Sequence, residues 1–393
     1  MQASSLKPSK RKTRRMNPAE SVKNLPTVFP PSYWLDKSER EEFPVEFWRE
    51  CMRLRLPGFL TPEKYGGLGR SLEDLVDVVV FLGEHGFGTG VYPLLSNNMS
   101  SLVLLNSGDE KLAELFLPKL AMGEYIMGLA ITEKTSGSDV LSITTKAEYR
   151  NGVYVVNGEK MFVNNIDAAT HMLLAARTTP ADKAGKRSEG LTLFILDLKQ
   201  EGVSFQPLPK TGTNYYKTGM MTLKDVEISG ERVVGPVGRG WKTLTAALNP
   251  DRIVYAALGA GSALYAVKTA SAHAVERVVF GKPVGSYQGI QLPLAENYTL
   301  AEAARLLCIE AARAYDRGER ADVLACMAKY MASEVAVKSL THAMQVLGGY
   351  GYLKERHLER VLRDMLLLKS GPITQELALA YVAERGLMLP RSY

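Results

Sequence analysis

The chain has 393 residues, of which 46% are hydrophobic and 23% are charged, a balance typical of a globular protein. This length exceeds one ordinary core and predicts two or three packed domains. The formal net charge of +6 equals the six Lys and Arg residues of positions 7–15, a run without an acid. We therefore expect a basic disordered leader over residues 1–16 and no nucleic acid as the main partner; a nucleic-acid or membrane-surface tail is the alternative interpretation.

The distribution of apolar residues and cysteines argues against membrane spans, a signal peptide and a metal site. No apolar run is long enough to predict a membrane span, and the N-terminus lacks the apolar stretch of a signal peptide. The three cysteines, Cys51, Cys308 and Cys326, are odd in number and widely spaced, so we expect neither a disulfide framework nor a metal site. A reducing, cytoplasmic compartment is the predicted location.

Residues 17–124 form the first predicted domain, and their apolar spacing is mostly helical. The predicted helices lie at 45–56, 71–85, 93–107 and 109–121. Ser71 is expected to cap the second of these helices, with Asp74 three residues on. The first domain is therefore an N-terminal helical domain.

Residues 125–237 form the second predicted domain, in which short alternating runs replace the helical pattern. The predicted strands lie at 143–150, 153–164, 171–178 and 191–198. Turn signals at Asn151-Gly152 and Asn157-Gly158 separate these runs, and no crossover of helix length intervenes. The spacing therefore predicts a central antiparallel β-domain.

Residues 238–393 return to long helical patterns and form the third predicted domain. The predicted helices lie at 250–279, 288–317, 320–347 and 374–388. No short repeat is present, which argues against a solenoid. The predicted fold class is thus a multidomain α+β protein, with the β-domain between an N-terminal helical domain and a C-terminal domain similar to a four-helix bundle.

The start of the third domain carries an acid that two interpretations explain. Asn249 and Pro250 are typical of the cap and first position of a helix, which places Asp251 in the first turn, where the helix dipole favours a carboxylate. The Ala- and Gly-rich residues that follow leave room for something to lie against this helix. Asp251 is therefore either a helix-start residue or a base directed into a cavity.

Three motifs stand in order around the β-domain. The first comprises Thr132, Glu133, Gly137, Ser138 and Asp139. The second comprises Arg277, Phe280, Gly281, Pro283 and Gln288. The third comprises Gln345, Gly348, Gly349, Gly351, Tyr352, Arg363 and Asp364. Each motif alone suits an ordinary turn or capping role, but together and in this order they resemble the acyl-CoA dehydrogenase family along nearly the whole chain.

The resemblance implies FAD-dependent oxidation of an acyl-CoA thioester to the trans-2-enoyl-CoA in lipid metabolism, with electrons passed to an electron-transferring flavoprotein. It also implies a homo-oligomer, usually a dimer of dimers, because the neighbouring subunit holds the adenosine end of FAD. Ser138 and Arg252 are implied to bind substrate. The residues implied to bind FAD are Ile131, Thr132, Gly137, Ser138, Phe162, Asn164, Arg277, Phe280, Gln288, Gln345, Gly348, Gly349 and Thr374.

Two positions beside the flavin depart from the family pattern. The family usually has a tryptophan packed on the flavin, followed by a Thr or Ser near flavin N5, where this chain has Phe162 and Asn164. Phe can still pack on a ring and Asn can still donate a hydrogen bond, so we expect flavin binding. Phe162 taken alone equally suits a core residue of a β-strand.

The base also departs from its usual place. Most members carry a Glu after the Arg-Asp pair, where this chain has Pro372, which lacks the N–H that helps to polarise the thioester in the family. Isovaleryl-CoA and long-chain acyl-CoA dehydrogenases instead place the Glu twenty-six residues before the arginine of the second motif and directly before another Arg. The same count from Arg277 reaches Asp251, which Arg252 follows, so the resemblance implies Asp251 as the base.

Two other functions on the same fold fit these departures. Phe162 and Asn164 suit a flavin-dependent monooxygenase or oxidase, in which O₂ reoxidises the flavin. Pro372 and the missing glutamate suit a catalytically impaired flavin-binding subunit that acts beside a competent partner. Fold alone does not separate these alternatives.

Overall fold

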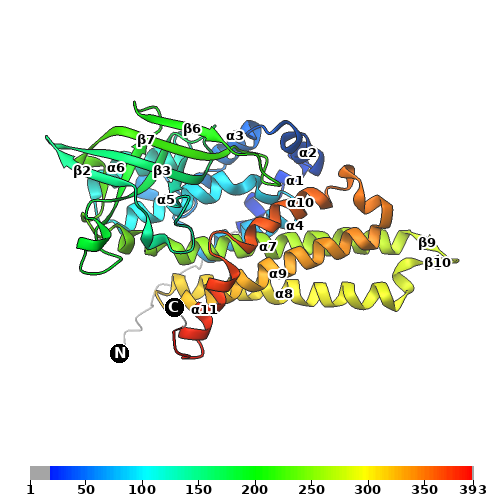
Figure 1. Ribbon diagram of the computed structural model, residues 1–393. Helices are drawn as coiled ribbons and strands as arrows, with labels where there is room; N and C mark the ends of the chain where they lie inside the picture. Colours follow the sequence, from blue (N-terminus) through cyan, green and yellow to red (C-terminus); the bar gives the residue numbers. More distant parts are fainter. Residues whose placement is uncertain (1–17, 392–393) are drawn as a thin grey trace, which may run out of the picture.

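The computed structural model describes residues 18–391, and the predicted leader over residues 1–16 lies outside them. In the described chain, helices α1–α6 come first, strands β1–β8 follow, and helices α7–α11 complete the fold (Figure 1). This arrangement confirms the predicted α+β fold class, with a β-domain between two helical domains.

The N-terminal helices cover residues of the predicted first domain. They are α1 (Leu25–Val28), α2 (Pro31–Arg40), α3 (Val45–Arg53), α4 (Leu72–Glu84), α5 (Tyr92–Asn106) and α6 (Glu110–Met122). The Ser71 hydroxyl accepts a hydrogen bond from the Asp74 N–H at 3.1 Å, which confirms the predicted cap of α4. Helices α4 and α5 pack directly against the C-terminal domain through α7.

The strands of the main sheet follow in the order β6-β7-β3-β2-β4-β5-β8, with β1 beside β4. They are β1 (Met127–Ala130), β2 (Lys146–Arg150), β3 (Val153–Asn164), β4 (His171–Arg177), β5 (Leu191–Asp197), β6 (Val203–Pro207), β7 (Thr218–Ser229) and β8 (Val233–Val234). Most pairs are antiparallel, as predicted, while β1 and the first residue of β2 pair with β4 in parallel. The β2–β3 hairpin lies between β1 and β4 in sequence and serves as the crossover that a parallel pair requires.

The C-terminal domain is organised around one long helix. Its elements are α7 (Gly240–Glu276), β9 (Val278–Val279), β10 (Lys282–Pro283), α8 (Gln288–Asp316), α9 (Asp322–Leu347), α10 (Leu358–Leu366) and α11 (Gln375–Arg385). Helices α7, α8 and α9 lie side by side, and α7 runs along the length of the molecule past the sheet (Figure 1). Because α7 also packs against α4, α5 and β5, it contacts all three domains.

Helix α7 begins at Gly240, ten residues before its predicted start, and Pro250 lies inside it. The prediction that Asn249 and Pro250 begin a helix is therefore wrong. Leu244 belongs to the same buried cluster as Leu193 of β5, and we attribute the helical first turns to this packing, which outweighs the missing N–H of the proline. Asp251 lies about three turns into α7, beyond the reach of the helix dipole, so the helix-start interpretation of this acid is excluded.

The small residues of α7 are explained by close helix packing. A Cβ built on Gly261 would lie 2.3 Å from the Val80 carbonyl oxygen of α4, and one on Gly259 would lie 3.1 Å from the Ala332 carbonyl oxygen of α9. The backbones of α4 and α9 thus occupy the room that the Ala- and Gly-rich pattern leaves. At these two positions, the expectation that the face leaves space for a ligand is wrong.

One buried carboxylate joins the three domains. Asp364 of α10 accepts hydrogen bonds from the Thr89 N–H at 3.0 Å and from the Thr213 N–H at 2.7 Å. One turn earlier, the guanidinium of Arg360 donates to the Gly86 carbonyl oxygen at 2.6 Å. These bonds connect the C-terminal domain to the start of α5 and to the loop before β7, and so fix the positions of these two segments.

Helix α7 is also the one element of residues 18–391 that is long and apolar enough to cross a membrane by composition. However, 89% of its most apolar window is buried inside the protein, as in the central helix of a packed core. The described residues therefore show no evident membrane span.

The first prediction concerns the contact between α4 and α7. Gly261→Ala should lower the free energy of unfolding by about 1–3 kcal/mol, because the added methyl group meets a backbone oxygen that cannot move without separating the helices. This loss should exceed the gain of up to about 1 kcal/mol that alanine brings in helix propensity. Urea unfolding followed by circular dichroism measures the difference.

Gly230→Ala is the matched control, because a Cβ at Gly230 meets no atom within 4 Å. It should leave the unfolding midpoint nearly unchanged. Equal midpoints for the two variants would contradict the assignment of the α7 glycines to helix packing.

Candidate active site

Asp251 presents a half-buried carboxylate from the middle of α7, and this carboxylate has no hydrogen-bond or ion-pair partner within residues 18–391. Burial raises the pKa of Asp251 to about 7, although the charge of Arg252 acts in the opposite direction. Arg252 instead donates a hydrogen bond to the Asn249 side-chain oxygen at 2.9 Å. An unpaired carboxylate in a desolvated position costs folding free energy, and a pKa near neutrality is typical of a general base.

Two tyrosines, Tyr92 and Tyr255, stand near this carboxylate, and a third, Tyr216, packs on Tyr92. Tyr255 lies one turn beyond Asp251 on the same face of α7. Its ring centroid is 6.3 Å from that of Tyr92, the first residue of α5, and Tyr92 stacks on Tyr216 at 4.8 Å. Burial raises the pKa of Tyr92 to about 12; hydrogen bonds with Asn164 and Ser96 oppose this rise, and the charge of Asp251 adds to it.

The end of β3 brings Phe162 and Asn164 to the same region. The pairing of β3 with β7 shifts between Lys160 and Val163, and Phe162 takes a φ of 57° with 63% of its surface exposed. A β-bulge turns the side chain away from the sheet, so the interpretation of Phe162 as a core residue is wrong. Asn164 is held in place, since its side-chain oxygen accepts a hydrogen bond from the Thr218 hydroxyl at 2.7 Å.

The loop after β1 carries Ile131, Thr132, Gly137 and Ser138, and a buried ion pair supports it. The Lys160 ammonium lies 2.8 Å from a Glu133 carboxylate oxygen and donates to the Ile131 carbonyl oxygen at 3.0 Å. These contacts fix the backbone on either side of Thr132. Ser138 is exposed, and its hydroxyl has no partner within the part of the chain that the structure describes.

Burial and ion pairing have opposite effects on the pKa values of Glu133 and Lys160. Burial disfavours the charged form of Glu133, but Lys160 and hydrogen bonds from Thr144 and Thr145 lower the pKa of Glu133 to about 2. Burial lowers the pKa of Lys160 to about 8, partly opposed by Glu133. Both side chains are therefore charged at neutral pH, and each is the main partner of the other.

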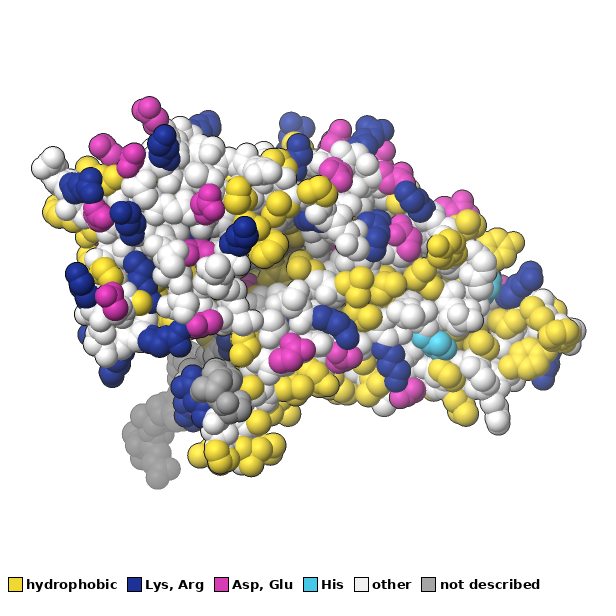
Figure 2. Space-filling model, in the orientation of Figure 1, with side chains coloured by type: hydrophobic (Ala, Val, Ile, Leu, Met, Phe, Trp, Pro, Cys, Tyr) yellow, Lys and Arg dark blue, Asp and Glu magenta, His cyan; other side chains and the backbone are white. Residues whose placement is uncertain are grey.

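The remaining residues implied to bind the cofactor gather at the opposite end of α7. They lie on the β9–β10 turn, the start of α8 and the end of α9: Arg277, Phe280, Gln288, Gln345, Gly348 and Gly349. Phe280 is 94% exposed, and apolar side chains cover this end of the molecule (Figure 2). Along α7, Arg277 is about 39 Å from Asp251, so one chain does not bring the two groups together.

The start of α11 packs on α9, where the Gln375 side-chain amide donates a hydrogen bond to the Ser333 hydroxyl at 2.8 Å. Thr374 caps α11, because its hydroxyl accepts a hydrogen bond from the Leu377 N–H at 3.2 Å, and the hydroxyl can still donate to a ligand. Pro372 is exposed and offers no N–H. On the neighbouring helix α9, the buried ammonium of Lys329 has no hydrogen-bond partner in residues 18–391.

The residues present fit FAD as a ligand. A Cβ on Gly349 would meet no atom within 4 Å, and one on Gly137 would meet only a methyl group of Thr132 at 3.9 Å, so both backbones are open to close approach. Phe162 offers an exposed ring for a flat aromatic system. Arg277 is exposed and suits a diphosphate, which its guanidinium can bind through paired hydrogen bonds.

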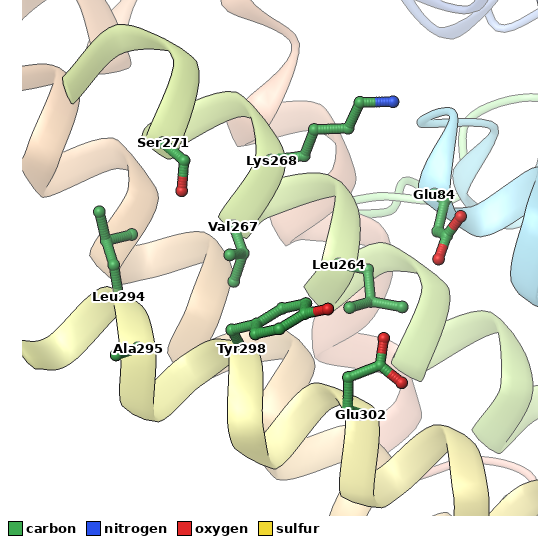
Figure 3. Close-up of a pocket in the computed structure, with 9 residues that line it drawn as sticks. All are labelled: Glu84, Leu264, Val267, Lys268, Ser271, Leu294, Ala295, Tyr298 and Glu302. Carbon is green, nitrogen blue, oxygen red and sulfur yellow. The ribbon is translucent and has the colours of Figure 1, made fainter. Parts of the chain in front are cut away.

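A separate cavity of about 540 Å³ lies between α4, α7 and α8 (Figure 3). Its polar lining consists of Glu84, Lys268, Ser271, Tyr298 and Glu302. Leu264, which also lines it, follows Asp251 by thirteen residues, or about 20 Å of helix. The cavity is therefore not part of the site around Asp251.

Sequence reasoning missed the tyrosines and Lys160. Tyr255 has a readable signal, since it stands four residues after Asp251 on a predicted helix. Tyr92 and Tyr216 come from separate segments, and no local pattern indicates that their rings meet. Lys160 lies in a strand in which alternation alone does not mark a buried charge.

The chain matches three family descriptions in sequence order. These are the acyl-CoA dehydrogenase N-terminal domain at residues 30–124, the middle domain at 128–226 and the C-terminal domain at 238–387. It is 32% identical to a 3-(aryl)acrylate reductase of Clostridium sporogenes, over 88% of this chain and 91% of the relative. It is also 32% identical to the acyl-CoA dehydrogenase FadE12 of Mycobacterium tuberculosis, over 92% of each chain.

Among solved structures, butyryl-CoA dehydrogenase from Megasphaera elsdenii has a similar fold. The TM-score is 0.87 at 28% sequence identity, and the match covers 95% of this chain and 96% of the other. The similarity therefore extends over all three domains rather than over one of them.

The second prediction concerns the Glu133–Lys160 pair. Lys160→Met should lower the free energy of unfolding by about 3 kcal/mol, because the change leaves a buried carboxylate without its counter-charge. It should also reduce the amount of FAD that purifies with the protein, since Lys160 holds the Ile131 carbonyl group. Urea unfolding and the flavin absorbance of the purified protein measure the two effects.

Lys146→Met is the matched control, because Lys146 forms an exposed pair with Glu148 at 3.2 Å. The expected change in the free energy of unfolding is below about 1 kcal/mol, with no change in FAD content. If the two variants behave alike, the buried pair does not support the loop.

Proposed function

The chain belongs to the acyl-CoA dehydrogenase family of FAD-dependent oxidoreductases that act on CH–CH bonds, and we propose that Asp251 is its catalytic base. The observation that carries this proposal is the unpaired carboxylate in the middle of α7, whose pKa burial raises to about 7. The position of Asp251 within α7 excludes an interaction with the helix dipole as the explanation for an acid there. Within the described residues, neither an ion pair nor a capping hydrogen bond explains it.

In the proposed reaction, Asp251 removes a proton from the α-carbon of the acyl group. The Cα–H bond breaks, the proton passes to a carboxylate oxygen, and the electron pair of that bond contributes to the new Cα–Cβ double bond. When bound beside the loop after β1, FAD would supply the acceptor for the hydride that leaves Cβ. Because burial favours the neutral carboxylic acid, the desolvated position of Asp251 strengthens the base at neutral pH.

Asn164 is proposed to donate a hydrogen bond to the reactive edge of the flavin. The Thr218 hydroxyl occupies the Asn164 side-chain oxygen, which leaves the amide hydrogens of Asn164 as donors. Phe162 is proposed to cover one face of the ring, with Ile131, Thr132, Gly137 and Ser138 along the loop. Arg252 and Ser138 are proposed to bind the thioester substrate, as the family pattern implies.

A homo-oligomer is proposed because the two groups of FAD-binding residues lie about 39 Å apart along α7. One chain would hold the flavin end, and the β9–β10 end of a second chain, through Arg277, Phe280, Gln288, Gln345 and Gly349, would hold the adenosine end. The exposed apolar residues at that end, Val275, Val278 and Phe280, suit burial against another copy (Figure 2). A dimer is the smallest assembly that completes the site, and a dimer of dimers is the proposed form.

An electron-transferring flavoprotein is the proposed electron acceptor, and a cytoplasmic location and a role in lipid metabolism remain predictions from the sequence. The motif set around the β-domain supports this acceptor. The oxidase alternative rests on Phe162 and Asn164, and both residues do border the proposed flavin site.

The third prediction tests Asp251 as the base. Asp251→Asn should lower turnover by roughly two to four orders of magnitude while FAD and acyl-CoA still bind, because the amide keeps the shape but cannot accept the proton. Asp251→Glu should retain measurable activity, since it restores the longer side chain that the family uses at this place. Steady-state turnover with a dye acceptor, together with FAD content, measures both variants.

An Asp251→Asn enzyme that turns over at the wild-type rate would exclude Asp251 as the base. Lys242→Met, an exposed change nine residues earlier on α7, is the control for effects of altered helix charge and should leave the rate unchanged.

The fourth prediction concerns the electron acceptor. Flavin reduced by an acyl-CoA under anaerobic conditions should be reoxidised much faster by an electron-transferring flavoprotein than by O₂. Stopped-flow absorbance of the flavin measures both rates on the same sample. Faster reoxidation by O₂, with release of peroxide or a hydroxylated product, would establish the oxidase or monooxygenase alternative, and no reduction by any acyl-CoA would support an impaired subunit.

A further inference from the structure

We infer that Tyr92 closes the acyl cavity and limits this enzyme to compact acyl groups. The inference rests on the proposed role of Asp251 as the base. It names a residue that determines specificity, and it narrows the substrate class from acyl-CoA thioesters in general to those with few carbons beyond Cβ.

The first step is the position of Tyr92 relative to the base. Tyr255 follows Asp251 by one helical turn, about 6 Å along α7, and points from the same face. The ring of Tyr255 is 6.3 Å from the ring of Tyr92. Tyr92 is also close enough for the Asp251 charge to act on its hydroxyl group. The ring of Tyr92 therefore stands across the space in front of the carboxylate.

The second step is the position of Tyr92 relative to the flavin side. Asn164, the residue proposed to meet the reactive edge of the flavin, lies close enough to the Tyr92 hydroxyl to act on its pKa. A substrate must place Cα at Asp251 and Cβ near that edge. Since Tyr92 reaches both residues, it borders the space into which carbons beyond Cβ would extend.

The third step is that the ring is held in place. Tyr92 stacks on Tyr216 with an angle of 30° between the ring planes, and Tyr216 is only 1% exposed. The Lys210 ammonium also lies over the Tyr216 ring, 4.6 Å from the ring centroid. Pro93 follows Tyr92 and restricts the backbone at the start of α5. A long acyl chain would have to displace Tyr92 from this stack.

The expected effect on affinity follows from the burial of methylene groups. Each additional buried methylene raises affinity by roughly fourfold, so octanoyl-CoA would bind roughly two-hundredfold more tightly than butyryl-CoA in an open cavity. A cavity closed by Tyr92 gives no such increase. The ratio of the two affinities therefore shows whether Tyr92 closes the cavity.

The test uses the FAD-loaded Asp251→Asn variant as background, so that the thioesters are bound without being consumed. Isothermal titration with butyryl-, hexanoyl- and octanoyl-CoA gives the affinity series. We expect octanoyl-CoA to bind no more than about threefold more tightly than butyryl-CoA in this background. Adding Tyr92→Ala should raise that ratio at least tenfold, and adding Tyr92→Phe, which keeps the ring, should leave it unchanged.

Tyr149→Ala is the matched control, because Tyr149 is 64% exposed on β2 and does not belong to the stack of Tyr92 on Tyr216. A steep increase in affinity from butyryl- to octanoyl-CoA with Tyr92 intact would overturn the inference and leave the proposed function standing. The same holds if Tyr92→Ala keeps its thermal unfolding midpoint and the ratio does not change. Absence of binding by every acyl-CoA would instead overturn the proposed function together with the inference.

Discussion

Helix α7 must bury its length against all three domains while it carries a carboxylate about three turns from its start. A buried carboxylate without a partner is unfavourable while it is charged, so a protein keeps one where it is protonated or has a function. The same burial that costs stability brings the pKa of Asp251 to about 7, where a carboxylate can both accept and hold a proton near neutral pH. The packing of α7 therefore also sets the pKa of the proposed base.

The surroundings of Asp251 show how distant segments meet on this helix. Asp364 fixes the start of α5 and the loop before β7 through backbone N–H groups, and these two segments supply Tyr92 and Tyr216. The Glu133–Lys160 pair fixes the loop that faces them from the β-domain. Buried charged groups therefore hold the site from two sides, and neither Asp364 nor the Glu133–Lys160 pair takes part in the proposed reaction.

The order of domains and the Ser71 cap could be predicted because they are local properties of the sequence. The start of α7 could not, because packing of Leu244 against the sheet outweighs the local signal of Pro250. Phe162 was ambiguous for a similar reason, since the bulge that exposes it depends on the register with β7. The proposal that Asp251 is the base rests on a resemblance in motif spacing, whereas its tyrosine neighbours are visible only in the structure.

The most direct measurement of the central claim is the pH dependence of anaerobic flavin reduction by a saturating acyl-CoA. If ionised Asp251 is the base, the rate should fall about tenfold per pH unit below a pKa near 7 or higher and level off above it, because protonation removes the proton acceptor. The slow residual rate of Asp251→Asn should lack this dependence. A rate that is flat from about pH 5 to pH 9 with Asp251 intact, or the same pH profile in Asp251→Asn, would contradict the account.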